Sequence, residues 1–156
     1  MAVAEKIRDN TMNNIKPFQL HPELAGDSVE ILDFPLCKLL LCNDCNYPWF
    51  ILVPQVADIE EIYQLDWQQQ QQFLNESSLL SEFLKQEFSA DKMNVAALGN
   101  IVPQLHIHHV VRYKHDLCWP NPIWGRNPEK PYQENELQLL INRIKPKLLA
   151  IIADKN

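Results

Sequence analysis

Three of the five histidines in the chain fall within four positions, in the stretch QLHIHHVV that spans residues 104–111. Imidazole titrates near neutral pH, acts as a nucleophile and donates hydrogen bonds to phosphate oxygens. Side chains alternate faces along a strand, so a strand here would place Gln104, His106 and His108 on one face. His109 would lie on the opposite, apolar face, where we interpret it as a structural residue.

Three interpretations of His106 and His108 stay open at this point. The pair is catalytic if a substrate bridges the two imidazoles, which lie roughly 7 Å apart on a regular strand. The pair binds a metal ion if His115, Asp116 or Cys118 supplies a third ligand. The pair is structural if neighbouring polar groups satisfy both rings.

The flanking sequence predicts the elements that must position these histidines. Short apolar or alternating runs bounded by turn residues are typical of strands. We expect five strands, at residues 28–32, 37–43, 49–54, 92–98 and 102–113. The turn residues at 43–48 predict that the second and third strands form a hairpin.

Helical spacing predicts two helices between the third and fourth strands. The first covers 57–65, with Asp58 as its N-cap and Glu61 completing a capping box. The second begins after a cap at Asp66 and ends near Phe88.

A final helical stretch is expected at 134–152, where Pro146 should kink or split the helix. The five glutamines at 68–72 are interpreted as a solvated helix face. A short helix near the start of the chain is also possible. Strands and long helices do not alternate regularly, which favours an α+β fold with a mainly antiparallel sheet.

The composition is that of one ordinary globular domain. The chain has 156 residues, of which 46% are hydrophobic and 22% charged, with a formal net charge of -6. The negative charge and the lack of a basic patch argue against nucleic acid as a partner. We expect no membrane span and no secretion signal, and four cysteines without a disulfide pattern favour a cytoplasmic location.

The stretch GNIVPQLHIHHVVR resembles the signature of the histidine triad (HIT) superfamily of nucleotide hydrolases and transferases. That signature has three histidines alternating with apolar residues, after a Gly-Gln or Gly-Asn turn and a valine. Gly99 and Asn100 match the turn, and His106 and His108 match the second and third histidines. Gln104 replaces the first. The chain looks most like a small bacterial member with a shortened hairpin turn.

The resemblance extends over about residues 25–115 and implies a HIT-like, mainly antiparallel five-stranded sheet with helices packed on it. We therefore divide the chain into an N-terminal extension (1–24), a HIT-like domain (25–115) and a segment rich in Trp and Pro with a C-terminal helix (116–156).

The resemblance also implies a chemistry. The middle histidine of the family, here His106, attacks the α-phosphorus of a nucleotide and forms a nucleotidyl-histidine intermediate. The third, here His108, hydrogen-bonds phosphoryl oxygens. Gln104 can donate to a phosphate oxygen or orient a neighbour, but it cannot relay a proton as imidazole does. The implied substrates are dinucleoside polyphosphates or nucleoside phosphoramidates, and the implied assembly is a homodimer.

The attack needs no cofactor, although a divalent metal can accompany the nucleotide. Two other functions stay open beside the enzyme. One is a nucleotide-binding module whose catalysis has decayed, with Gln104 as the sign of decay. The other is a metal-binding protein that uses His106 and His108.

The resemblance further implies the substrate-binding residues. Family members bond the ribose hydroxyls from the end of the second strand, where Asn43 or Asp44 stands in this chain. Asn94 and Asn100 are further candidates for phosphate or ribose contacts.

Other segments carry weaker expectations. Phe34 and Leu41 are candidates for the apolar wall that holds the base. Residues 118–125, CWPNPIWG, form either a lid over the pocket or a pad at a dimer interface. Arg112 and Lys114 are interpreted as solvated charges that could also meet distal phosphates.

Overall fold

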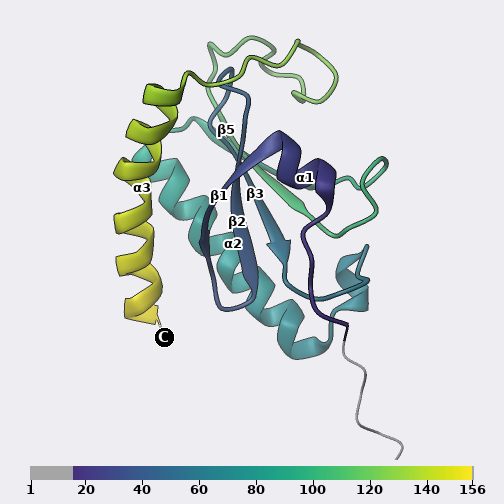
Figure 1. Ribbon diagram of the computed structural model, residues 1–156. Helices are drawn as coiled ribbons and strands as arrows, with labels where there is room; N and C mark the ends of the chain where they lie inside the picture. The colour runs from purple at the N-terminus through teal and green to yellow at the C-terminus, as the bar shows by residue number, and fades with distance from the viewer. Residues whose placement is uncertain (1–15, 156) are drawn as a thin grey trace, which may run out of the picture.

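The computed structural model describes residues 16–155, so the possible helix near the start of the chain lies outside the described residues. Figure 1 shows one sheet with helices on both of its faces. The elements in chain order are α1 (Pro22–Asp27), β1 (Ser28–Asp33), β2 (Cys37–Cys42), β3 (Trp49–Pro54), the 3₁₀ helix η1 (Ile62–Gln64), α2 (Trp67–Glu87), β4 (Lys92–Ala97), β5 (Ile107–Arg112) and α3 (Glu134–Lys155).

The sheet has five strands in the order β1-β2-β3-β5-β4, and every neighbouring pair is antiparallel. This confirms the predicted α+β class and the hairpin of β2 and β3. Strand β5 lies between β3 and β4, so its backbone is bonded on both sides. His108 pairs with Ile51 on one side and with Ala96 on the other. The histidine stretch is therefore held in the interior of the sheet.

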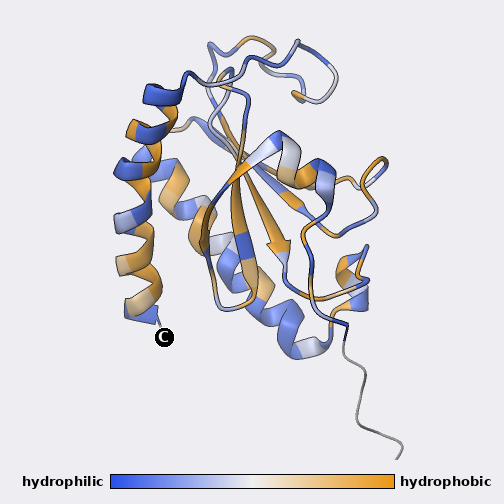
Figure 2. Cartoon of the chain, in the orientation of Figure 1, coloured by the Kyte–Doolittle hydropathy of each residue, from blue (hydrophilic) through white to orange (hydrophobic). Residues whose placement is uncertain are grey.

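The main core lies between the sheet and helices α2 and α3. Leu39 from β2, Leu80 from α2 and Ile144 from α3 are all fully buried in this cluster. Each such side chain stabilises the fold by about 2 kcal/mol through the apolar surface it removes from water. In Figure 2 the strands are largely apolar and α2 shows long hydrophilic stretches, as expected for a helix with one face in water. Helix α3 belongs to the same core as the HIT-like region.

A second, smaller cluster covers the opposite face of the sheet. Leu24 of α1 packs there against Leu40 of β2 and Ile51 and Val53 of β3. Figure 1 shows α1 in front of the sheet and α2 behind it. The two faces of the sheet are thus covered by different elements. In the described part of the chain, no helix has the length and apolar content to cross a membrane.

The helix predicted at 57–65 is wrong, because only the single 3₁₀ turn Ile62–Gln64 forms. Asp58 has a positive φ of 57°, a left-handed conformation that does not begin an α-helix. The capping box belongs instead to Glu61, which caps η1 together with Gln64. The carbonyl of Ile59 also accepts a hydrogen bond from the backbone N–H of Leu105, which ties this segment to the chain ahead of β5.

The strand predicted at 102–113 is shorter than expected and begins only at Ile107. Two causes lie in the chain before it. Pro103 has no N–H to donate to a sheet ladder. The N–H of Leu105 is used by Ile59, outside the sheet. Gln104 and His106 therefore precede the regular strand.

The two long helices, α2 and α3, agree better with the sequence-based prediction than the segment 57–65 and the start of β5 do. Asp66 caps α2 and forms a capping box with Gln69, as its type and position indicated. Most of the glutamine run is exposed or partly exposed, although Gln70 and Gln72 also make side-chain hydrogen bonds. Helix α3 continues through Pro146 without splitting.

Candidate active site

The histidines on the two faces of β5 have different surroundings. On the α2 face, His109 is fully buried. Its Nδ1 is 3.1 Å from the carbonyl oxygen of Ile107, and its Nε2 is 2.7 Å from the hydroxyl of Ser77 on α2. Because a carbonyl can only accept, Nδ1 carries the hydrogen and Nε2 accepts from Ser77. Burial lowers the pKa of His109 to about 4, so the ring is neutral at pH 7. Both nitrogens are occupied, as expected for a structural residue.

On the opposite face, His106 and His108 line a cavity of about 590 Å³. Each is only 7% exposed. Their ring centroids lie 4.9 Å apart in an edge-to-face arrangement. The rings are closer than the spacing expected for a regular strand, because His106 stands before the first strand residue, Ile107. One phosphoryl group can contact both rings at this separation.

The hydrogen bond made by His106 determines which of its nitrogens is free. Nδ1 lies 2.7 Å from the backbone carbonyl oxygen of Gln104. The carbonyl is an acceptor, so Nδ1 must carry the hydrogen when the ring is neutral. The lone pair is then on Nε2, which has no hydrogen-bond partner in the described part of the chain. A neutral imidazole with a free Nε2 can act as a nucleophile.

His108 has the opposite arrangement. The indole Nε1–H of Trp49 donates to Nδ1 of His108 at 2.9 Å. Burial, followed by the neighbouring His106 and His109, lowers the pKa of His108 to about 3. This imidazole is therefore neutral at pH 7.

The cavity is enclosed by segments that are far apart in the sequence. Its apolar wall comes from α1, β3, the loop after β4 and the Trp/Pro segment: Leu24, Trp49, Ile51, Leu98, Ile101, Val102, Ile123 and Trp124. The volume falls within the range of small-molecule sites, about 300–1,000 Å³. Phe34 and Leu41, expected in this wall, lie in the main core, because their side chains face α2 and α3.

Charged groups around the cavity are all acidic in the described part of the chain. Glu23 and Asp27 from α1, Asp44 from the hairpin turn and Glu129 line it, and no Lys or Arg of the described residues does. Asp27, Asp44 and Glu129 also raise the pKa of Cys42, after the larger effect of burial, which indicates that these carboxylates lie near one thiol. The cavity has a negative potential.

The side chain of Gln104 is directed elsewhere. Its Oε1 accepts from the backbone N–H of His21, and its Nε2 donates to the carbonyl of Gln19, each at 2.9 Å. The amide therefore joins the segment ahead of α1 to the segment ahead of β5, and it does not line the histidine cavity. Only the backbone carbonyl of Gln104 reaches the site, through His106.

Two of the four expected substrate-binding residues line the cavity. Asp44 is 4% exposed and accepts from the backbone N–H groups of Asn46 and Lys130 through one oxygen, Oδ1. Asn100 lines the cavity from the loop after β4.

The other two lie outside the cavity. The side-chain oxygen of Asn43 accepts from the backbone N–H of Tyr132, and that of Asn94 accepts from Arg112. Both oxygens serve the fold, since they connect strand ends to the C-terminal half of the chain.

Arg112 is buried, so the expectation of a solvated charge is wrong. The guanidinium forms two hydrogen bonds with Asp116, of 2.7 and 3.0 Å, and lies over the ring of Trp119 at 5.7 Å. Burial alone would raise the pKa of Asp116, but the hydrogen bonds from Arg112 and from two backbone N–H groups hold it below its usual value. Arg112 and Asp116 thereby anchor the start of the Trp/Pro segment.

The C-terminal end of the Trp/Pro segment forms one wall of the cavity. Ile123, Trp124 and Glu129 all line it. Ile123 and Trp124 belong to residues 118–125, which the sequence offered as a lid over the pocket or a pad at a dimer interface. The sequence did not predict Glu129 or the residues of α1, because they lie outside the motif. Asp116, one of the candidate metal ligands, is paired with Arg112 instead. The described residues include no group of three His, Cys, Asp or Glu that could hold a metal ion.

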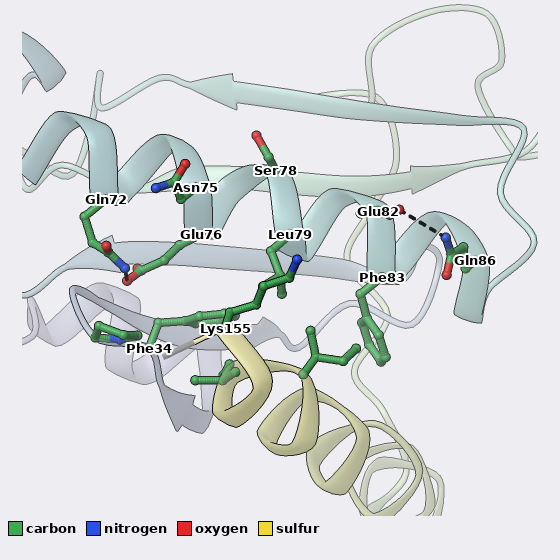
Figure 3. Close-up of a pocket in the computed structure, with 13 residues that line it drawn as sticks. Phe34, Gln72, Asn75, Glu76, Ser78, Leu79, Glu82, Phe83, Gln86 and Lys155 are labelled. Atoms are coloured by element: carbon green, nitrogen blue, oxygen red, sulfur yellow. Dashed lines mark hydrogen bonds between the residues drawn. The ribbon is translucent and has the colours of Figure 1, made fainter.

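Figure 3 shows a second cavity, of about 440 Å³, between α2 and the end of α3. Its buried acid, Glu76, accepts from the backbone N–H groups of Leu36 and Cys37 and from the side chain of Gln72. Glu76 therefore closes the turn between β1 and β2. Both of its oxygens already hold parts of the fold together, and no histidine lines the cavity.

Comparisons with known proteins agree with this geometry. The HIT domain family model matches residues 24–115. A histidine triad protein from Marinobacter aquaeolei is 52% identical, with a TM-score of 0.82 over 83% of this chain and 95% of that one. One from Bradyrhizobium japonicum is 44% identical, with a TM-score of 0.80 over 83% and 98%. One from Sinorhizobium meliloti is 40% identical, with a TM-score of 0.80 over 83% and 96%.

A search of curated proteins found no match. The family model covers more than half of the chain. The solved relatives have the same fold, and the similarity extends over almost their whole length. Together with the two histidines in one cavity, these similarities show that the chain belongs to the HIT family.

Proposed function

We propose that the protein is a nucleotide hydrolase or transferase that acts at the α-phosphate through a covalent intermediate on His106. HIT proteins are in general nucleotide-binding hydrolases and transferases. The observation that carries the proposal is the hydrogen bond from Nδ1 of His106 to the carbonyl of Gln104, because it leaves the Nε2 lone pair free beside the cavity.

The reaction has two displacements at phosphorus. In the first, Nε2 of His106 forms a bond to the α-phosphorus while the bond to the leaving group breaks with its electron pair. In the second, water or another acceptor attacks the same phosphorus, gives up a proton, and breaks the bond to Nε2. Splitting one displacement into two lowers each barrier. His108 donates to the phosphoryl oxygens, Asp44 accepts from the ribose hydroxyls, and Asn100 contacts the phosphate.

Two features favour particular substrates within the implied classes. The acidic cavity repels a polyphosphate, since its lining carries four carboxylates and, among the described residues, no Lys or Arg. Gln104, with its amide turned to Gln19 and His21, supplies no proton to the leaving group. The missing donor bears most on phosphoramidates, because the departing amine nitrogen must take a proton, here from solvent water, as the phosphorus–nitrogen bond breaks, whereas a polyphosphate departs as a stable anion. Among phosphoramidates we therefore expect those of weakly basic aryl amines to react faster than those of alkyl amines.

The test is a set of substrates with a matched pair of variants. Diadenosine tetraphosphate, adenosine phosphoramidate and an aryl-amine phosphoramidate are incubated with the protein, and the released mononucleotide is measured by chromatography. The His106→Ala variant should be inactive on all three. The His115→Ala variant removes an exposed imidazole outside the cavity and should keep wild-type activity.

A nucleotide-binding module without catalysis is the second candidate, favoured by the position of the Gln104 amide. Tight mononucleotide binding by wild type without turnover of any substrate would support it. In that case His106→Ala should weaken binding only modestly, because the nitrogen lone pair has no chemical role.

We also propose that the protein forms a homodimer through β4. This strand is at one edge of the sheet and carries Val95, which is 48% exposed. An unpaired edge with exposed apolar side chains favours association with another strand. Sedimentation velocity should show a dimer for wild type and a monomer for Val95→Lys. A monomeric wild type would contradict this assembly.

A further inference from the structure

Trp49 is joined to the site by a hydrogen bond that the proposed reaction does not use. Trp49 is the first residue of β3 and pairs with Val110, while His108 pairs with Ile51. Trp49 and His108 are thus diagonal neighbours on the same face of two paired strands. The indole N–H donates to Nδ1 of His108 at 2.9 Å, with the ring centroids 5.5 Å apart.

This bond determines where the hydrogen of His108 lies. An indole nitrogen only donates, so Nδ1 of His108 must be unprotonated. The neutral ring then carries its hydrogen on Nε2. A proton added to Nδ1 would face the indole N–H and break the bond. Trp49 therefore opposes protonation of His108 as well as rotation of its ring.

A second indole lies beside the same histidine and makes no hydrogen bond. Trp124 packs edge-on against both Trp49 and His108, with ring centroids 6.2 and 5.6 Å away. Its Nε1 is buried and has no hydrogen-bond partner among the described residues. The two tryptophans thus allow ring packing to be distinguished from hydrogen bonding. Both pack against His108, but only Trp49 donates a hydrogen bond to its Nδ1.

We propose that Trp49 is a positioning residue that fixes the hydrogen of the neutral His108 on Nε2 and directs this N–H toward the phosphoryl group, so that His108 donates throughout the reaction. The position of the hydrogen follows from the Trp49 contact alone. The role toward the phosphoryl group rests on the proposed function.

Other titratable groups also face this histidine. From its own segment these are His106 and His109. From the other elements that line the cavity they are Glu23, Asp27, Cys42, Asp44, Tyr47 and Glu129. The carboxylates would favour a protonated His108, but burial and the two neighbouring histidines oppose it and keep the ring neutral.

The direct test is nuclear magnetic resonance of the ¹⁵N-labelled protein. Wild type should show a scalar coupling between Nε1 of Trp49 and Nδ1 of His108 across the hydrogen bond. The ¹⁵N shifts of His108 should report a neutral ring with hydrogen on Nε2 from pH 8 down to pH 5. In Trp49→Phe, which keeps an aromatic ring but loses the donor, the ¹⁵N shifts of His108 should report a mixture of the two neutral tautomers, because nothing then holds Nδ1 unprotonated.

Kinetics give a second measurement. Trp49→Phe should lower kcat about tenfold, less than the 10²–10³-fold effect of deleting a transition-state donor, because the imidazole remains but is no longer held. KM should change little. Trp124→Phe is the matched control for the resonance experiment and should leave the hydrogen of His108 on Nε2, since its indole has no bond to lose.

Either of two results would overturn the proposal: hydrogen on Nδ1 of His108 in wild type, or the same single tautomer of His108 in wild type and Trp49→Phe. The resonance experiment needs no substrate, so an inactive wild type would remove the proposed function without deciding the tautomer. If Trp49→Phe does not fold, the scalar coupling between Trp49 and His108 in wild type tests the proposal by itself. Its absence would contradict the proposed hydrogen bond.

Discussion

The two faces of β5 present the same residue type in two different roles. On the α2 face, both ring nitrogens of His109 are bonded inside the fold, one to a backbone carbonyl and one to Ser77. On the cavity face, His106 and His108 each have one nitrogen bonded and one without a partner in the described part of the chain. The unused nitrogens, rather than the number of histidines, mark the site.

The difference arises from what covers each face. Helix α2 lies against one face along the main core and supplies a hydroxyl at the position of His109. The other face is covered by the short α1 and by the Trp/Pro segment, which leave a cavity of about 590 Å³ between them. A strand that alternates faces can therefore supply structure and chemistry from adjacent residues.

The largest difference between the faces should come from His106→Ala. Loss of the nucleophile should lower kcat/KM at least about 10³-fold, as for covalent enzymes whose nucleophile is removed. Thermal unfolding should change little, because the ring lines a cavity. Turnover and melting temperature, measured on the same preparation, check the predicted loss of activity and the predicted unchanged stability. An active variant would show that another group attacks phosphorus.

Replacing the second cavity histidine should have a smaller effect on activity. His108→Ala removes a hydrogen-bond donor to the phosphoryl oxygens, and we expect kcat to fall about 10²-fold. Single-turnover kinetics would separate this chemical step from product release. A change in KM alone would mean that His108 binds the ground state and the transition state equally.

The buried His109 should make the protein sensitive to mild acid. Its pKa is about 4 in the folded protein against 6.5 ordinarily, so the unfolded chain binds the proton first as the pH falls. The contribution of His109 to stability should therefore be fully present above pH 6.5 and decline towards pH 4, by about 3 kcal/mol at 1.36 kcal/mol per pKa unit. The buried His108, whose pKa is about 3, should add a further loss over the same range. Urea unfolding at pH 7.5, 6, 5 and 4 tests this, and an unchanged free energy of unfolding would contradict it.

Removing the hydroxyl that His109 uses should affect stability alone. Ser77→Ala leaves Nε2 of His109 buried without a donor, which should cost about 1–3 kcal/mol in the free energy of unfolding. The rate of turnover should stay within about twofold, because the proposed catalytic histidines are on the other face. Ser78→Ala, at an exposed position of the same helix, is the control. Loss of activity in a folded Ser77→Ala protein would mean that the two faces are coupled.

The smallest expected effect concerns the charge of the cavity. Glu129→Gln should raise kcat/KM for diadenosine tetraphosphate a few-fold, since it removes one of the carboxylates that repel the polyphosphate. The gain should shrink as salt is added, because ions screen exposed charges over about 10 Å at 0.1 M. Glu60→Gln, far from the cavity lining, should have no effect. A slower Glu129→Gln variant would argue that the carboxylate binds the substrate.

The sequence predicted the sheet well because each strand has its own local signal. The runs SVEIL and WFILVP were placed within a residue of the strands that form. The segment 57–65 was misread because Asp58 adopts a left-handed conformation that no pattern of side chains indicates. The start of β5 was misplaced because Leu105 donates to Ile59, a contact between segments distant in sequence.

The site was predicted in part for the same reason. His106, His108 and Asp44 belong to local motifs, and all three line the cavity. Leu24 could not be found, since it reaches the cavity only through the packing of α1, and Trp124 was offered only as part of a lid or a dimer pad. The spacing of Gln104 placed it beside the histidines, but its amide is bonded to Gln19 and His21 instead.

The measurement that tests the central claim most directly is the capture of the intermediate. Wild type and His106→Ala are mixed rapidly with an adenosine phosphoramidate and quenched in alkaline denaturant, which protects the phosphorus–nitrogen bond. The mass of each intact protein is then measured by mass spectrometry. We predict that wild type gains the mass of one nucleoside monophosphate, located on His106 by peptide mapping, and that the variant gains nothing. Turnover by wild type with the adduct on another residue, or an equal adduct in His106→Ala, would contradict the assignment of the nucleophile.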